Sequence, residues 1–450
     1  MSARPGSAQP DGVRTNGPAD VSARRIVALA ASAFVVLAAE PLFLLVDTAV
    51  VGHLGRNELA ALGAAGIVMT LLAIVGSSLE YGTTGRAARY FGAGRREAAV
   101  NEGVQASWLA LLIGLAAVAV GEIVTGPIVR VVTGGAGPVA DDAELWLRIA
   151  ILGLPGVLLV LAGNGWLRGV QDTRTPVRIV VVANALSAVA SPVLVYPGGM
   201  GLAGSAVANV AAQALAAALC VRALRAERVP GRPHWSVMRS QLVVSRDLVV
   251  RAMAFQAAYM TAAGVAGRMG AAQLAAHQVG LQLWEFIALL LDSFAIAAQS
   301  LVGAALGGGD VESAKSTAWR VSRYGVVAGV VFGLLAAAGW QLLPSLFSSD
   351  AAVQGQAHVL WPWLIAMMPL GGVLFALDGV LLGAGDNAYI RNVTVVAALG
   401  AFVPLALLAA KLHWGLGGVW AGIASFITVR LVGMAWRTWT GRWLVVGERR

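Results

Sequence analysis

The sequence predicts an all-α polytopic membrane protein whose twelve transmembrane helices form two six-helix bundles, related by a pseudo-twofold axis along the membrane normal. Three observations lead to this fold class. The 450-residue chain is 58% hydrophobic and 12% charged, which is too apolar for a soluble protein of its size. Apolar runs of about 20 residues, the length that crosses roughly 30 Å of hydrocarbon, recur along the chain. The two halves of the chain also repeat one another.

The apolar runs are long and continuous, whereas the strands of a membrane β-barrel alternate with period two. The fifth and sixth runs are separated only by the turn signal Tyr196-Pro197-Gly198-Gly199. The predicted spans lie near residues 25–51, 59–84, 102–124, 145–167, 177–197, 201–222, 248–267, 274–303, 322–343, 359–383, 393–411 and 416–436.

The spans divide the chain into five segments. Residues 1–22 are rich in Gly, Pro and Ser and cannot bury enough apolar surface to fold, so we expect a disordered tail. The other predicted segments are an N-terminal bundle (23–224), an inter-bundle linker (225–247), a C-terminal bundle (248–438) and a basic C-terminal tail (439–450).

Arginine side chains set the predicted orientation. The connections after the second and fourth spans and the linker are rich in arginine, whereas the intervening connections hold few basic residues. Every even-numbered exit is therefore positive, which predicts that both termini are cytoplasmic in a multi-pass protein of the plasma membrane. The net charge of +9 is thereby explained without nucleic acid as a partner.

The internal repeat has a nearly constant offset. A shift of 215 residues carries Gly92-x-Gly94-x-x-Glu97 onto Gly307-x-Gly309-x-x-Glu312, and a shift of 214 carries Gly165-x-Leu167-x-Gly169 onto Gly379-x-Leu381-x-Gly383. Since each half holds an even number of spans, the two copies share one topology, which is a common layout of secondary transporters.

Asp47 is a carboxylate inside the apolar first span, six residues after Pro41. Burying a charged side chain at the centre of the bilayer costs about 2.5–3.5 kcal/mol even on the lower scales, so such a residue is rarely kept without a function. The alternative is a protonated Asp that only ties helices together through hydrogen bonds.

Four segments resemble the multidrug and toxic compound extrusion (MATE) transporters, and in particular their DinF-like branch. They are PLFLLVDTAVVGHLGRNELAALG (41–63), ARYFGAGRREAA (88–99), WLRGVQDTRTP (166–176) and LDGVLLGAGDN (377–387). The first three segments lie in the first half of the chain and the fourth in the second, and the resemblance covers roughly residues 25 to 440.

The resemblance implies a secondary active antiporter that exports amphiphilic, often cationic, organic compounds by alternating access, driven by inward flow of H+ or Na+. It also implies that Asp47 is the coupling carboxylate and that it faces a polar cluster from the fifth and sixth spans. The matching positions of that cluster are Asn184, Ser187, Ser191 and Asn209.

The same cluster favours H+ over Na+. Sodium-binding relatives commonly have a second carboxylate where this chain has serine or asparagine, and a hard cation such as Na+ binds more weakly when an anionic oxygen ligand is lost. A proton requires only that burial favour the neutral form of the carboxylic acid. Na+ nevertheless stays possible, because serine and carbonyl oxygens can serve as ligands.

The second half carries acids of its own at Glu285, Asp292 and Asp378. Their functional interpretation is a central cleft that attracts cationic substrate or carries a second proton. The alternative is a polar link between helices or, for Asp378, a side chain that reaches the membrane surface. Tyr259, Met260 and Trp284 would add an aromatic and soft wall for planar cations.

Other polar residues near the membrane are interpreted as structural. We expect an ion pair of Glu80 with the nearby Arg86, and we expect Arg168, Asp172 and Asp386 to organise tight turns. His277 is expected to be a core histidine whose hydrogen bonds are satisfied, although a histidine that titrates near neutrality is the alternative.

Other functional classes fit less well. The sequence lacks a G-x-x-x-x-G-K-[ST] loop, an H-E-x-x-H motif and any Cys/His ligand spacing, which disfavours an enzyme, a metal site and a cofactor. A channel would need a ring of pore-lining charge. A flippase or exporter of a lipid or lipid-linked precursor is the main alternative. Such a protein would be expected to have a strongly basic cleft, whereas few arginines of this chain lie inside a span. We expect a monomer that contacts only lipid and its small-molecule substrates.

Overall fold

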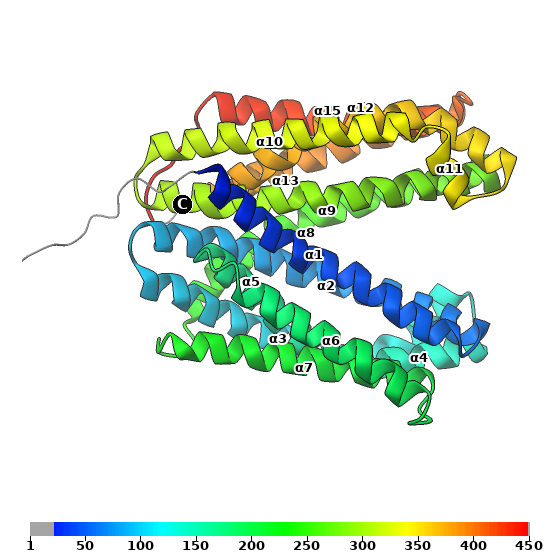
Figure 1. Cartoon of the computed structure of the whole chain (residues 1–450), viewed down its shortest axis with the longest axis horizontal. Helices are drawn as coiled ribbons and strands as arrows, with labels where there is room; N and C mark the ends of the chain where they lie inside the picture. The colour runs from blue at the N-terminus through cyan, green and yellow to red at the C-terminus, as the bar shows by residue number, and fades with distance from the viewer. Residues whose placement is uncertain (1–21, 449–450) are drawn as a thin grey trace, which may run out of the picture.

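The computed structural model describes residues 22–448, which are almost entirely helical. The predicted N-terminal tail lies outside the described residues apart from Ser22. Figure 1 shows two lobes of long, roughly parallel helices. The N-lobe comprises α1 (Ala23–Gly52), α2 (Arg56–Gly92), α3 (Arg96–Thr133), α4 (Pro138–Ile151), α5 (Leu154–Gly169), α6 (Thr175–Val195) and α7 (Leu202–Ala226). The C-lobe comprises α8 (Trp235–Met269), α9 (Ala271–Gly307), α10 (Val311–Ala338), α11 (Leu342–Phe347), α12 (Ala351–Gly383), α13 (Asn387–Val395), the π-helix η1 (Val396–Phe402), α14 (Val403–Lys411) and α15 (Gly415–Trp439).

The number of spans agrees with the prediction. Within residues 22–448, eleven helical segments are long and apolar enough to cross a membrane, and α4 with α5 supplies a twelfth that is bent by 50°. The bend follows from Pro155, which cannot donate the backbone hydrogen bond that would continue α4 into α5. The predicted fold class is confirmed.

The repeat is visible in the helix boundaries. A shift of 215 positions carries the first and last residues of α2 onto those of α9, and both helices have 37 residues. A shift of 214 carries the end of α5, Gly169, onto the end of α12, Gly383. The two copies differ at an equivalent pair of prolines. The helix is interrupted before Pro155, between α4 and α5, whereas α12 continues through Pro369 without a break.

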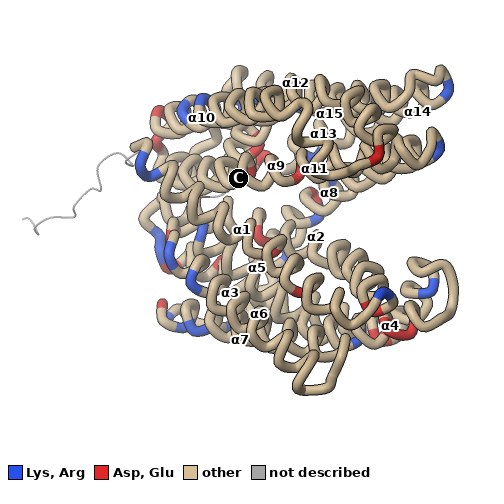
Figure 2. The backbone as a smooth tube through the Cα atoms, turned by 45° about the vertical axis from the view of Figure 1, so that its right-hand side comes forward, with Lys and Arg blue, Asp and Glu red and all other residues tan. Residues whose placement is uncertain are grey.

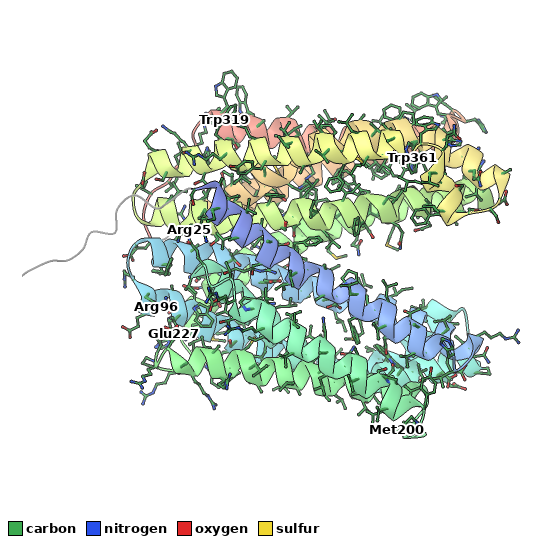
Figure 3. All side chains as sticks on the ribbon, viewed as in Figure 1. Arg25, Arg96, Met200, Glu227, Trp319 and Trp361 are labelled. Carbon is green, nitrogen blue, oxygen red and sulfur yellow. The ribbon has the colours of Figure 1, made fainter. Side chains whose placement is uncertain are left out.

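Most of the arginines gather at one end of the molecule, which we call the arginine-rich end and which is on the left in Figures 1 and 2. The helices α2, α5, α9 and α12 finish there. Figure 3 shows one of its ion pairs, in which Arg96 of α3 lies 2.6 Å from Glu227 at the end of α7.

The lobes are in close contact at the arginine-rich end. A Cβ atom added to Gly92 of α2 would lie 1.8 Å from the carbonyl oxygen of Ala304, and one added to Gly307 of α9 would lie 2.0 Å from the carbonyl oxygen of Arg89. Only glycine permits such backbone approach between helices. Towards the other end, α1 and α2 diverge from α8 and α9 (Figure 1).

Each lobe has its own core, and the larger core belongs to the C-lobe. Trp361 is fully buried in it, and its indole N–H donates a 2.9 Å hydrogen bond to the carbonyl of Ala336. Trp319, by contrast, points outward from α10 and is largely exposed (Figure 3). Ile26 at the start of α1 packs into the C-lobe core, so this helix links the lobes.

The predicted linker and the predicted C-terminal tail are both partly ordered. The predicted inter-bundle linker becomes helical at Trp235, so that residues 235–247 form the first turns of α8. The predicted C-terminal tail continues beyond α15 to Glu448 along the arginine-rich end, and Trp443 within it is buried.

Candidate functional site

Asp47 of α1 is buried in the N-lobe, with 2% of the residue exposed. The hydroxyl of Ser191 on α6 donates a 3.0 Å hydrogen bond to its Oδ1. The hydroxyl of Ser205 on α7 donates a 3.3 Å hydrogen bond to its Oδ2. The indole N–H of Trp146 on α4 donates a 2.9 Å bond to Ser205 Oγ and fixes that hydroxyl in place. Four helices therefore hold one carboxylate.

The predicted cluster around Asp47 is only partly the one that forms. Ser191 bonds the carboxylate, but Ser187 is one turn away, and its buried hydroxyl has no hydrogen-bond partner in the described part of the chain. Asn184 instead donates to the carbonyl of Ala39 at 3.1 Å. None of the hydrogen bonds found within residues 22–448 joins Asn209 to Asp47.

The sequence analysis missed Ser205 and Trp146. Ser205 precedes Asn209 by four residues and therefore lies on the same face of α7, one turn nearer the end where α7 begins. The sequence thus identified the polar face of α7, but the residue that bonds Asp47 lies one helical turn before Asn209. Among the described residues no group of three or more His, Cys, Asp or Glu side chains is placed to hold a metal ion.

Asp378 of α12 is also buried but is neutralised by arginine. Its Oδ2 accepts a hydrogen bond from Arg251 of α8 and lies 3.4 Å from Nη2 of Arg430 on α15. The guanidinium of Arg430 stacks over the ring of Phe255 at 4.5 Å. Asp378 was expected either to line a cleft or to extend its side chain to the membrane surface. It is instead the centre of an internal ion-pair cluster.

The other predicted cleft residues fall in three environments. Asp292 of α9 accepts a hydrogen bond from the Tyr81 hydroxyl of α2, which joins the two lobes. Glu285 is exposed, and Met260 is 74% exposed. Trp284 is buried in the C-lobe core against Gly371, so its assignment to a cleft wall was wrong.

Tyr259 of α8 is half-buried, and its hydroxyl is hydrogen-bonded to the indole of Trp284. Of the predicted aromatic and soft wall, Tyr259 and Met260 keep access to solvent or lipid.

A second buried ion pair lies close to the contact between the lobes. Glu80 pairs with Arg168 of α5 at 2.6 Å, while Arg86 makes a bidentate pair with Glu102 of α3. The expected pair of Glu80 with Arg86 was therefore wrong in its partner, because these side chains leave α2 in different directions. The carbonyl of Arg168 accepts from Ser300 of α9 at 2.7 Å, which adds a bond across the lobes.

The MatE family model matches this chain twice, over residues 32–193 and 248–408. The chain belongs to the MatE family. Each match covers most of one lobe, which is the repeat that the two shifts of the sequence revealed. The MATE resemblance is thereby confirmed, and the protein is a transporter of the multidrug and toxic compound extrusion type.

Curated MatE relatives align over nearly the whole chain. Protein DETOXIFICATION 44, chloroplastic, of Arabidopsis thaliana is 31% identical over 437 residues, which are 93% of this chain and 83% of that protein. DNA damage-inducible protein F of Escherichia coli (strain K12) is 30% identical over 422 residues, which are 90% of this chain and 89% of that protein.

Solved structures share the two-lobe fold. One described as an outward-facing conformation of a multidrug resistance MATE family transporter superposes with a TM-score of 0.82 at 21% identity, covering 94% of this chain and 96% of that one. At this identity the likeness concerns the fold alone.

The turn after α5 in this MatE chain is organised by Asp172. Its carboxylate accepts hydrogen bonds from the backbone N–H of Arg174 and from the N–H and hydroxyl of Thr175 at the start of α6. Burial raises the pKa of Asp172, but these hydrogen bonds outweigh burial and bring the pKa below its usual value. The matching Asp386 instead binds Arg437 of α15 at 2.6 Å.

His277 of α9 is fully buried and lies edge-on to Trp420 at 6.0 Å between ring centroids. Neither ring nitrogen has a hydrogen-bond partner among the described residues. The expectation of a core histidine is right for its burial and wrong for its hydrogen bonds.

Proposed function

We propose that the protein is an H+-coupled antiporter that exports amphiphilic, often cationic, organic compounds by alternating access, with Asp47 as the carboxylate that carries the proton. The observation behind the proposal is the setting of Asp47. It is buried among four helices, receives two serine hydroxyls and has no cationic partner in the ion pairs found within residues 22–448. Such a carboxylate can bind and release a positive ion without breaking a structural ion pair.

A proton suits this site better than sodium. Ser205 Oγ already accepts from the Trp146 indole while it donates to Asp47, so one of its two lone pairs is in use. Sodium needs several oxygen ligands with their lone pairs directed at the ion, and Asp47 contributes the only carboxylate of this cluster. A proton needs a single carboxylate oxygen, and the serine hydroxyls can rotate to follow it.

We place the arginine-rich end in the cytoplasm and the protein in the plasma membrane, because basic residues mark the cytoplasmic ends of transmembrane helices. In that orientation the lobes are in contact on the inside and diverge towards the outside. The conformation then corresponds to the stage at which substrate leaves and a proton reaches Asp47.

The substrate preference rests on the C-lobe side chains that stay accessible. Glu285 is exposed on α9, and no ion pair found within residues 22–448 includes it, so its charge is available to a cation. Tyr259 and Met260 offer aromatic and polarisable surface on the neighbouring α8.

In this proposal the chain acts as a monomer and as a transporter, not an enzyme. It requires no cofactor other than its coupling ion.

The test uses purified protein in liposomes loaded with a fluorescent organic cation. A pH gradient and a sodium gradient are imposed separately, and efflux is followed in each case. We expect the pH gradient alone to drive efflux, and the Asp47→Asn variant to reduce that rate by at least about a hundredfold, a transport barrier higher by about 2.7 kcal/mol.

Glu122→Gln is the matched control, because Glu122 is an exposed carboxylate of the same lobe, on α3. Its rate should equal that of the unmodified protein. Efflux driven by sodium at constant pH would contradict the choice of ion, and full activity of Asp47→Asn would contradict the choice of residue.

A further inference from the structure

The chain beyond α15 crosses from one lobe to the other at the arginine-rich end. We call residues 441–448 the C-terminal strap. Gly441 turns the chain with a φ of 67°, and Trp443 is then buried in the C-lobe core, 1% exposed. The indole N–H of Trp443 donates to the carbonyl of Thr438 at 2.9 Å. The strap is therefore anchored to the C-lobe before it reaches the contact between the lobes.

The far end of the strap bonds to both lobes. The backbone N–H of Gly447 donates to the carbonyl of Leu306, in the last turn of α9, at 3.0 Å. The guanidinium of Arg89 on α2 donates to the carbonyls of Gly447 at 2.8 Å and Val445 at 3.1 Å. Glu448 forms an ion pair with Arg95 in the loop between α2 and α3.

Arg89 lies at the point where the lobes touch. The residue is 3% exposed, and it also donates to the carbonyl of Ala384 at the end of α12, at 2.7 Å. Its own carbonyl is in the close backbone contact with Gly307 of α9. The strap thus bonds to both sides of the contact between α2 and α9, and a cavity of about 50 Å³ beside α2 is lined in part by Arg89 and Glu448.

We propose that the C-terminal strap is a conformational latch that stabilises the state in which the lobes are closed at the arginine-rich end. The inference rests on the proposed alternating-access cycle, in which α2 and α9 must separate at this end. Because Trp443 and Gly447 hold the strap to the C-lobe, separation breaks its bonds to Arg89 and Arg95. The strength of these bonds therefore helps to set how much of the protein opens to the cytoplasm.

Gly447 offers a way to release the latch without touching either lobe. Its φ of 113° lies where L residues are strained, and its N–H makes the bond to Leu306. Proline has no N–H and a φ near −65°, so Gly447→Pro removes this geometry. Val446→Ala is the matched control, because the Val446 side chain is 49% exposed and its removal leaves the backbone bonds intact.

The measurement is a distance distribution between two spin labels at the arginine-rich end. Glu97 of α3 and Glu312 of α10 are exposed, related by the repeat and in different lobes, so both are changed to cysteine for labelling. The background carries Cys220→Ala, which removes the chain's single cysteine. Double electron–electron resonance in nanodiscs then reports the populations of the closed and open states.

We expect Gly447→Pro to raise the ratio of long-distance to short-distance states by about tenfold, because it removes the bond to Leu306 and changes the backbone geometry that holds the Gly447 carbonyl against Arg89. Truncation after Leu444 retains Trp443 and should give the same shift. Val446→Ala should leave the distribution unchanged. Thermal melting of all variants should stay close to that of the unmodified protein, which distinguishes a latch from a structural brace.

Two results would overturn the latch. One is an unchanged distribution in both Gly447→Pro and the truncated chain, under conditions in which the unmodified protein does populate the long distance. The other is a melting temperature that falls without any shift in distances. Absence of the long distance in every variant at every pH would contradict the proposed alternating-access cycle instead, so the two failures are separable.

Discussion

The two lobes share one fold and treat their buried carboxylates in opposite ways. Asp47 in the N-lobe and Asp378 in the C-lobe are 2% and 4% exposed. Asp47 is held by serine hydroxyls, whereas Asp378 is paired with the guanidinium groups of Arg251 and Arg430. One carboxylate can exchange an ion, and the other is committed to the structure.

The repeat shows that the fold itself requires neither carboxylate. A shift of 215 places Ala262 of α8 at the position of Asp47, and a shift of 214 places Asn164 of α5 at the position of Asp378. The matching positions of Arg251 and Arg430 in the N-lobe are Val36 and Ala216. Each lobe therefore acquired its own charges on a common scaffold, which lets each set be tested against the other lobe's residues.

The largest expected effect is on the stability of the C-lobe. Asp378→Asn leaves two largely buried guanidinium groups without their carboxylate, which should cost about 3–5 kcal/mol of unfolding free energy. The triple variant Asp378→Asn, Arg430→Ala, Arg251→Val copies the N-lobe and should recover most of this loss, because no unpaired charge remains. Thermal melting in detergent measures both, and a triple variant less stable than the single one would contradict this account.

A second test places a carboxylate where the C-lobe has none. Ala262→Asp adds a buried acid at a residue that is 0% exposed and should cost about 1–3 kcal/mol, because the new polar group is taken out of water at a site that is built around a methyl group. Ala262→Val adds similar volume without polarity and serves as the steric control. If the two variants have the same melting temperature, the destabilisation comes from the added volume and not from the buried acid. That result would contradict the contrast drawn between the lobes at this position.

A smaller effect separates the serines beside Asp47. Ser191→Ala removes a 3.0 Å hydrogen bond to the carboxylate and should slow pH-driven efflux about fivefold, a change of about 1 kcal/mol. Ser187→Ala is the control on the same helix, because its hydroxyl does not reach Asp47, and its rate should stay within about twofold. Equal losses in the two variants would favour a wider site that includes Ser187, as the sequence had suggested.

The sequence carried most of the fold because bilayer thickness and helix rise fix the length of an apolar span, and those lengths can be counted. The helix ends were less exact, because the predicted spans 59–84 and 274–303 lie inside the longer helices α2 and α9, whose observed ends obey the repeat. The break between α4 and α5 was not anticipated. Pro155 and Pro369 are equivalent in sequence, but only the first interrupts its helix, so the outcome depends on the helices packed around each.

The site was less predictable because it depends on the relative axial positions of the helices that pack together. Helical periodicity gives the face of α7 that carries Ser205 and Asn209, but not which turn lies level with Asp47. The partner of Glu80 was missed for a related reason. Arg86 is near in sequence, whereas Arg168 comes from another helix, and only tertiary packing brings it within 2.6 Å.

The smallest expected effect compares the equivalent turns at Asp172 and Asp386. Because the pKa of Asp172 is lowered by folding, its charge stabilises the protein above the usual value near pH 3.9, and this contribution is lost as the pH falls below that value. Asp172→Asn should cost about 0.5–1 kcal/mol at pH 7, towards the lower limit because the side chain is partly exposed. The melting difference from the unmodified protein should therefore be about 1–3 °C at pH 7 and should become smaller as the pH falls below about 3.9. Glu122→Gln, at an exposed carboxylate inside α3, should show no difference at any of these pH values. A difference at Asp172 that keeps its full size as the pH falls would mean that the turn depends on the shape of the side chain, and that the charge itself contributes nothing.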